Sequence, residues 1–424
     1  MKRFLALFLA LIMSLSLVAC GGDSAENDGS TETDGSTETD GSTETEESTE
    51  PFKVGFYGAL TGSNALAGEC STNAMQLYIK QLNERGGLNG RQVEFVSYDD
   101  ANLPEEAVRC ATRLAEVDEC DAVFAGFYSS CILASGSVLN DAGIPFFVGG
   151  LSPTLTSQGW TYVARTSLNT NNNIPELPGI LEELGLSKIA VLQSQDEYGT
   201  SSGNNMRTAA EEAGMEVTTT ENYVSGDTDF SGQVNRIVAT EPDAVFLAAP
   251  AQDCGVLVRQ LRQYGWTGLV FGSELLNTSA MEIAGDAADH MMFAYPYVVY
   301  NDISMYDEST NKAMYDFQMA YEAEYGKACG SDCGYRAWDA MVVLEEAVNR
   351  AGSTDPDAIM EQIYQIDDVM SLSGKVMDFS REQNGDCMYE FNYYVIVDGE
   401  PITLEQWRET EDFTTYAAEQ GWTV

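Results

Sequence analysis

Residues 53–62 read KVGFYGALTG and residues 74–90 read AMQLYIKQLNERGGLNG, and together they predict the unit from which the fold is built. The first stretch holds a short apolar run, Val54 to Leu60, which is typical of a buried strand. In the second stretch apolar residues recur at helical spacing from Ala74 to Leu82. The glycine pair at 86–87 then supplies the left-handed cap with which helices often end. A strand followed by a helix of this kind is one βα unit.

The same alternation continues along the chain in two series. The first series adds expected strands at 93–98, 122–125 and 146–148 and a helix at 104–115, which opens at Pro104. The second series has expected strands at 189–193, around Val217, at 244–248 and at 269–271, with a helix ending at Gly214 and another at 229–240. Strands that alternate with helices indicate parallel sheets joined by right-handed crossovers.

The fold class that we predict is therefore α/β, with two Rossmann-like lobes. Helices expected at 313–325 and 337–350 follow the second series, so we expect them to return to the first lobe through a hinge that the chain crosses several times. We assign residues 52–169 and 300–373 to lobe 1, and residues 170–299 and 374–424 to lobe 2 and a C-terminal extension. Ligands of such sheets bind beyond the carboxyl ends of the strands, which here is the cleft between the lobes.

The first twenty residues have the pattern of an export signal. Two basic residues precede an apolar run from Phe4 to Val18, which is too short to span a bilayer comfortably. The run ends in Leu17-Val18-Ala19-Cys20, which resembles the bacterial lipobox, whose cysteine receives a diacylglycerol. We predict a signal peptide at 1–20, lipidation of Cys20 and anchoring at the outer face of the cell membrane, on a Gram-positive-type surface in preference to a periplasm. An ordinary secretory signal is the alternative.

Residues 21–51 have no large apolar side chain before Pro51 and no base, and they contain three hexads that begin at Gly29, Gly35 and Gly41. Such a segment cannot bury a core. We interpret it as an acidic, expanded tether that holds the folded part away from the membrane. A low-complexity remnant without selected length remains the alternative.

The formal net charge of −46 limits the partners. Nucleic acid and an anionic membrane surface would both repel this chain, so we expect neither, and we expect membrane contact through the lipid anchor only. We expect a monomer. The charge does not limit a small ligand, because acidic side chains are mostly solvated.

Eight cysteines remain apart from Cys20, an even number in an exported chain, which makes disulfides plausible. Spacing suggests only the local pair Cys329 and Cys333 and leaves the other pairings open. Zinc is the alternative use of these cysteines, but the sequence lacks a second closely spaced ligand pair. Its one histidine, His290, is interpreted as a surface or strand-edge residue. Phosphate-loop and HExxH motifs are absent from the sequence, and we expect no enzyme, no metal and no cofactor.

From about residue 51 to 399 the chain resembles the type I periplasmic binding proteins of the leucine/isoleucine/valine kind. The stretches that carry the resemblance are VGFYGALTG at 54–62, NERGGLNG at 83–90, YDD at 98–100, GIP at 143–145, DEYG at 196–199, SGDTDF at 225–230 and AGSTDP at 351–356. Their order and spacing together are more specific than any one of them. The resemblance implies the substrate-binding component of an ABC importer, which captures an amino acid and delivers it to a membrane permease.

The resemblance also implies the ligand contacts. The carboxylate of the amino acid would be held by Ser130, with further donors from Gly150 and Ser152, and its ammonium by Glu274. Helix capping is the alternative role of the two serines. Tyr198 matches a tyrosine at the cleft edge of the second lobe, for which plain packing is the alternative.

Two positions depart from the family pattern. Ala67 stands where relatives often have an aromatic residue over the ligand's side chain, and Pro250 stands where a tyrosine is expected. The loss of two rings removes apolar contact, so leucine, isoleucine or valine does not follow for this chain, although Tyr128 could refill the space. Larger amino acids, amides, short peptides and aromatic acids stay open, as does a ligand-sensing lipoprotein of the same fold.

Overall fold

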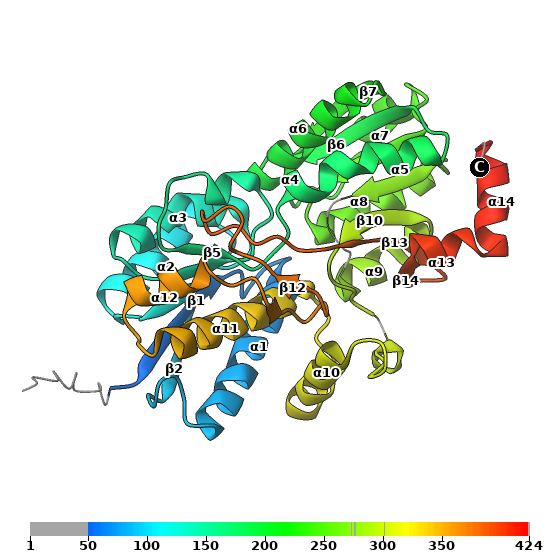
Figure 1. Cartoon of the computed structure of the whole chain (residues 1–424). Coiled ribbons are helices and arrows are strands. Elements are labelled where there is room, and N and C mark those ends of the chain that lie inside the picture. Colours follow the sequence, from blue (N-terminus) through cyan, green and yellow to red (C-terminus); the bar gives the residue numbers. More distant parts are fainter. Residues whose placement is uncertain (1–49, 273, 275–276, 301, 423–424) are drawn as a thin grey trace, which may run out of the picture. The chain divides into compact units, whose positions relative to one another are not determined.

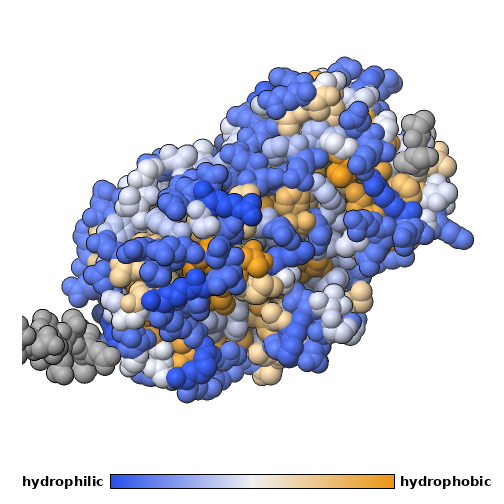
Figure 2. Space-filling model, in the orientation of Figure 1, coloured by the Kyte–Doolittle hydropathy of each residue, from blue (hydrophilic) through white to orange (hydrophobic). Residues whose placement is uncertain are grey.

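The computed structural model describes residues 50–272, 274, 277–300 and 302–422. The predicted signal peptide with Cys20, and the tether up to residue 49, lie outside the described residues. Strands and helices alternate along the described chain (Figure 1). Hydrophilic residues cover most of the face shown in Figure 2, as the net charge leads one to expect. Among the helices of the described ranges, none is long and apolar enough to cross a membrane.

Five parallel strands form the first sheet, in the order β2-β1-β3-β4-β5. The inner strands are almost wholly buried, as expected of a parallel sheet with helices on both faces. We call the body built on this sheet lobe 1. Its strands are β1 (Phe52–Gly58), β2 (Val93–Asp99), β3 (Ala122–Phe124), β4 (Phe146–Val148) and β5 (Val163–Arg165), and its first helices are α1 (Ala65–Glu84), α2 (Pro104–Glu116) and α3 (Ser129–Asp141).

The second sheet has seven strands in the order β14-β13-β10-β9-β8-β6-β7. Strands β6 to β10 pair in parallel, whereas β13 and β14 form an antiparallel hairpin at one edge. We call this body lobe 2. Its strands are β6 (Lys188–Ser194), β7 (Glu216–Tyr223), β8 (Ala244–Ala248), β9 (Leu269–Gly272), β10 (Met291–Tyr295), β13 (Asn392–Val397) and β14 (Glu400–Thr403), and its helices are α4 (Thr170–Asn173), α5 (Leu177–Glu183), α6 (Glu197–Glu212), α7 (Ser231–Val238), α8 (Ala251–Gln263), α9 (Thr278–Ala284), α13 (Leu404–Arg408) and α14 (Glu411–Gln420).

The chain passes between the two sheets three times: between β5 and β6, after β10, and before β13. After β10 come α10 (Lys312–Tyr325), α11 (Asp332–Ala351), α12 (Pro356–Ile363) and the short strands β11 (Val369–Met370) and β12 (Val376–Met377). Helix α11 packs along α1, and the buried Ser71 hydroxyl of α1 donates to the Cys333 carbonyl of α11 (3.1 Å). Helix α11 thus packs against the first helix of lobe 1.

The predicted α/β fold with parallel sheets and flanking helices is confirmed, and the predicted strands lie within a few residues of those observed. The residues at which one lobe gives way to the other stay a prediction. Strands β5 and β10, the β13–β14 hairpin and several helices, α3 and α8 among them, were not predicted. Helix α3 was missed because Ser129–Asp141 mixes small and polar residues among few large apolar ones, so its apolar stripe is weak.

Candidate functional site

A cavity of about 400 Å³ lies between the lobes. This volume is within the range of about 300–1,000 Å³ that is usual for ligand pockets and suits one small molecule. The lining residues come from the segments that follow β1, β2, β3 and β4 in lobe 1 and β6, β7, β8 and β9 in lobe 2, together with the start of α11. The cavity thus lies where parallel α/β sheets bind ligands, at the carboxyl ends of the strands.

Ser130 lines the lobe 1 wall of this cavity, in the first turn of α3. Its hydroxyl oxygen accepts a hydrogen bond from the backbone nitrogen of Glu197 in lobe 2 (3.2 Å). The backbone N–H groups of a first helical turn have no partner within the helix and favour an anion. Ser130 and the start of α3 therefore form a wall that suits a carboxylate.

Gly150 and Ser152, the two other predicted carboxylate donors, are not among the lining residues. Ser152 is fully buried, caps the short 3₁₀ turn Pro153–Thr156, and donates its hydroxyl to Glu197 Oε1 (3.0 Å). A side chain at Gly150 would place its Cβ 2.9 Å from Ser129 Oγ, so this position has no room for one. The capping role considered for Ser152 is confirmed, and its contact with a ligand stays a prediction.

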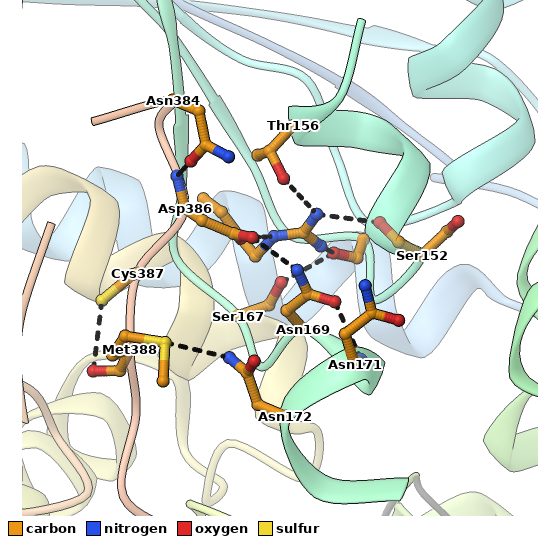
Figure 3. Close-up of polar contacts among 12 residues, drawn as sticks. Ser152, Thr156, Ser167, Asn169, Asn171, Asn172, Asn384, Asp386, Cys387 and Met388 are labelled. Atoms are coloured by element: carbon orange, nitrogen blue, oxygen red, sulfur yellow. Dashed lines mark hydrogen bonds and ion pairs between the residues drawn. The ribbon is translucent and has the colours of Figure 1, made fainter. Parts of the chain in front are cut away.

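The loop that contains these two residues is held by a buried arginine that the sequence analysis missed. Arg165, at the end of β5, is fully buried and donates Nη2 to the Ser152 carbonyl (2.8 Å) and Nη1 to the Gly150 carbonyl. Its Nε donates to Asp386 Oδ1 (2.6 Å), which lies on the third crossing between the sheets. Figure 3 shows Asp386, Ser152 and Thr156 converging on this point. The loop is thereby tied to the hinge region.

Glu274 also lines the cavity, from lobe 2 just after β9, and its side chain is 15% exposed. Burial raises the pKa of this carboxyl to about 8, against the opposing effect of Arg336, whose Nη2 lies 3.5 Å from Glu274 Oε1. Asp332 is the next largest influence and raises the pKa further. A cation brought into the cavity would therefore stabilise the ionised form of the Glu274 carboxyl.

Arg336 and Asp332, in the first two turns of α11, line the cavity beside Glu274 and were not predicted. Arg336 is 1% exposed and donates Nε to Asp332 Oδ2 (2.9 Å) and Nη1 to the Gly149 carbonyl (2.7 Å). Asp332 also accepts a hydrogen bond from the Tyr295 hydroxyl (2.7 Å). An acid and an arginine four residues apart just after the capping Ser331 were the signal that could have found them.

The remaining predicted contacts all line the cavity. Tyr198 lies in the first turn of α6, and Tyr128 precedes α3, where its ring lies 5.0 Å from that of Phe127. Ala67 is in the first turn of α1, and Pro250 is the N-cap residue of α8. The structure therefore brings six of the eight predicted contacts together around one cavity.

The predicted disulfide is wrong for this structure. The eight cysteines of the described chain are free and buried, Cys329 and Cys333 included. Helix α11 begins between the two, so the Cys329 thiol stays in the preceding loop and donates to the Ser331 carbonyl (3.3 Å), whereas Cys333 lines the cavity. Burial raises the pKa of both thiols well above the ordinary value.

His290 lies outside the cavity, at the edge of β10, as predicted. Its Nε2 lies 2.9 Å from Asp412 Oδ2, and its ring stacks on that of Tyr416 at 4.1 Å. The described residues contain no group of three or more histidine, cysteine, aspartate or glutamate side chains that could hold a metal ion.

Comparisons with known proteins identify relatives of this chain and structures with the same fold. A leucine-, isoleucine-, valine-, threonine- and alanine-binding protein of Pseudomonas aeruginosa is 28% identical over 317 residues, which is 74% of this chain and 82% of the relative. The isoleucine complex of a branched-chain amino acid transporter substrate-binding protein from Streptococcus pneumoniae superposes with a TM-score of 0.73 at 20% identity, covering 83% of this chain and 98% of that one.

The fold by itself does not select an amino acid. A solute-binding protein of an ABC transporter from Rhodopseudomonas palustris BisB5, in complex with 3,4-dihydroxybenzoic acid, superposes with a TM-score of 0.71 at 24% identity, covering 83% of this chain and 95% of that one. The family described as periplasmic binding protein matches residues 51–393. The chain accordingly belongs to the periplasmic binding protein family of extracytoplasmic solute-binding proteins.

Proposed function

We propose that this protein captures one α-amino acid in the cavity between its lobes and delivers it to the permease of an ABC importer. The observation that carries the proposal is the placement of Ser130 and Glu274 on opposite lobes around one cavity. The Pseudomonas aeruginosa relative, a leucine-, isoleucine-, valine-, threonine- and alanine-binding protein, supports it.

The chemistry of the two walls suits a zwitterion. A carboxylate that leaves water needs fixed donors, and the Ser130 hydroxyl with the start of α3 offers them. An ammonium group needs a charge-assisted acceptor, which Glu274 provides. We assign Tyr198 and Tyr128 to packing against the ligand between these two groups.

Capture requires that the ligand hold the lobes together. Direct contacts already cross the cleft: Glu197 bonds Ser130, Ser152 and Thr154, and Arg336 lies beside Glu274. A ligand that touches Ser130 and Glu274 at once adds to the closed state alone, so it shifts the population toward closure. We infer that the closed form is the one that docks on the permease.

We propose capture without turnover. Family members are binding proteins, and the histidine of this chain is bonded to Asp412 outside the cavity. A ligand incubated with the protein should be recovered unchanged. A chemically altered ligand would contradict this part of the proposal.

We further propose that Cys20 carries a lipid anchor and that the protein works as a monomer at the outer face of the cell membrane. The motif at residues 17–20 supports the anchor. Replacement of Cys20 by serine should abolish lipid labelling, while labelling that persists would contradict the anchor.

A thermal-shift screen of the chain from residue 21 onward tests the ligand class. A ligand at 100 times its Kd adds about 2.7 kcal/mol to the free energy of unfolding, which is easily measured. We expect α-amino acids to raise the melting temperature. The proposal fails if aromatic acids or sugars do so and no amino acid does.

A further inference from the structure

A second set of cavity residues has a chemistry of its own. The Ser71 hydroxyl contacts the carbonyl of Ala67 (2.9 Å) and that of Cys333 (3.1 Å), which makes these two small lining residues neighbours. The backbone nitrogen of Thr278 donates to the Gly330 carbonyl (3.1 Å), which brings the start of α9 beside the start of α11. Here the cavity is lined by small side chains and by amides.

Two lining amides of lobe 2, Gln252 and Asn277, are hydrogen-bonded to each other at 3.3 Å. Asn277 is 5% exposed, and its Oδ1 accepts from the backbone nitrogen of Ala280 (2.8 Å), because it caps α9. This fixes the orientation of both groups: Asn277 presents oxygen to the helix and to Gln252, so Gln252 must present its nitrogen to Asn277.

Two polar atoms are left over. Among the contacts of the described residues, neither Nδ2 of Asn277, which is a donor, nor Oε1 of Gln252, which is an acceptor, has a partner. One donor beside one acceptor is the complement of a carboxamide, which offers a carbonyl oxygen and an N–H group side by side. Asn64 of lobe 1 is another lining amide, and its side chain makes no capping bond to α1.

Charge and hydrogen-bonding capacity narrow the choice of ligand side chain. Neither Gln252 nor Asn277 is charged, so the side chain of lysine would find no counter-ion at this pair, and the neighbouring Asp332 is already bonded to Arg336 and Tyr295. A side-chain carboxylate would find one donor in Asn277 but an acceptor, not a donor, in Gln252. Leucine would cover both amides without a hydrogen bond, and an unsatisfied buried polar group costs about 1–3 kcal/mol.

We propose that the ligand is an α-amino acid with a carboxamide side chain, whose carbonyl accepts from Asn277 Nδ2 and whose amide donates to Gln252 Oε1. This inference rests on the proposed function, since it assigns only the side-chain subsite of the same cavity. Ala67 and Pro250, which stand where the family pattern has aromatic rings, are consistent with it.

Titration calorimetry with L-glutamine, L-asparagine, L-leucine, L-glutamate and L-lysine tests the proposal on the chain from residue 21 onward. We expect one of the two amides to bind at least tenfold more tightly than the other three ligands. Gln252→Leu should weaken binding of that amide about tenfold and leave leucine unaffected or tighter. Asn277 is left intact because it caps α9. Gln76→Leu, on the exposed face of α1, is the matched control and should change nothing.

Tighter binding of leucine, glutamate or lysine to the unaltered protein overturns this inference and leaves the proposed function standing. An amide preference that survives Gln252→Leu also overturns it. If none of the five amino acids binds, and the wider screen finds none, the proposed function fails and this inference fails with it.

Discussion

Two buried arginines hold the same loop from different elements, and their partners differ. Arg165 donates to the carbonyls of Gly150 and Ser152, and Arg336 donates to that of Gly149. The acid that pairs with Arg165 is Asp386, on the crossing before β13. Arg336 pairs with Asp332 on its own helix and faces Glu274 of the other lobe.

The difference separates stability from function. Arg165 and its acid lie outside the lining of the cavity and their contacts do not depend on a ligand, so we assign them to stability. Arg336 lines the cavity and reaches across the cleft, so a ligand ammonium placed at Glu274 acts on the same charges. We infer that Arg165 stabilises the loop and that Arg336 responds to the charge of the ligand.

Asp386→Ala should give the largest effect. It leaves the guanidinium of Arg165 buried without its counter-ion, and breaking a buried ion pair from one side costs about 3–5 kcal/mol. Urea denaturation should show this loss in the free energy of unfolding. Asp368→Ala, which breaks a pair with Arg350 at a carboxylate that is 65% exposed, is the control and should cost no more than about 1 kcal/mol. Equal losses in the two variants would contradict the role assigned to Arg165.

Glu274→Gln should act on binding and not on folding. The amide cannot compensate the ligand's ammonium, and removing one partner of a buried charge pair costs about 2–5 kcal/mol, so we expect at least thirtyfold weaker amino-acid binding by calorimetry. The unliganded variant should unfold no earlier than the parent, because burial already disfavours the ionised form of Glu274. Unchanged affinity would remove Glu274 from the site.

The raised pKa of Glu274, about 8, predicts opposite pH trends for binding and stability. As the pH rises from 6 to 8, more of the carboxyl ionises and amino-acid affinity should increase, by no more than tenfold per pH unit. The stability of the unliganded protein that this group contributes is fully present below the unfolded pKa, near 4.3, and is lost as the pH rises through 8. Calorimetry at several pH values measures the first trend, and Glu274→Gln should flatten it.

Local patterns sufficed to predict four strands of each sheet, because most of these strands are short apolar runs between turn signals, whereas β5, β10, β13 and β14 were not predicted. The position of the cavity followed from the topology of parallel sheets. The order of lobes along the chain followed from the helices after the second series. These features depend on residues that are near one another in the sequence.

The contacts that the sequence did not reveal join distant residues. Arg165 and Asp386 are far apart in the chain, and their pairing depends on where the third crossing runs. Glu197 was part of a recognised motif, yet its bond to Ser152 requires the two lobes to meet. The disulfide predicted between Cys329 and Cys333 is wrong for the opposite reason. The two residues are close in the sequence, but their spacing did not reveal that a helix begins between them.

Ser152→Ala should have the smallest effect on ligand binding, and it distinguishes a bond to Glu197 from a contact with the ligand. If its hydroxyl serves Glu197, as the 3.0 Å contact indicates, its removal costs about 0.5–1.5 kcal/mol of closure and weakens binding tenfold or less. The loss should then be non-additive with Glu197→Ala in a double-mutant cycle. If Ser152 instead binds the ligand's carboxylate, as the family resemblance implies, the two losses should add. Ser157→Ala, which removes an exposed hydroxyl that donates to the Thr154 carbonyl, is the control from the same loop and should leave binding unchanged.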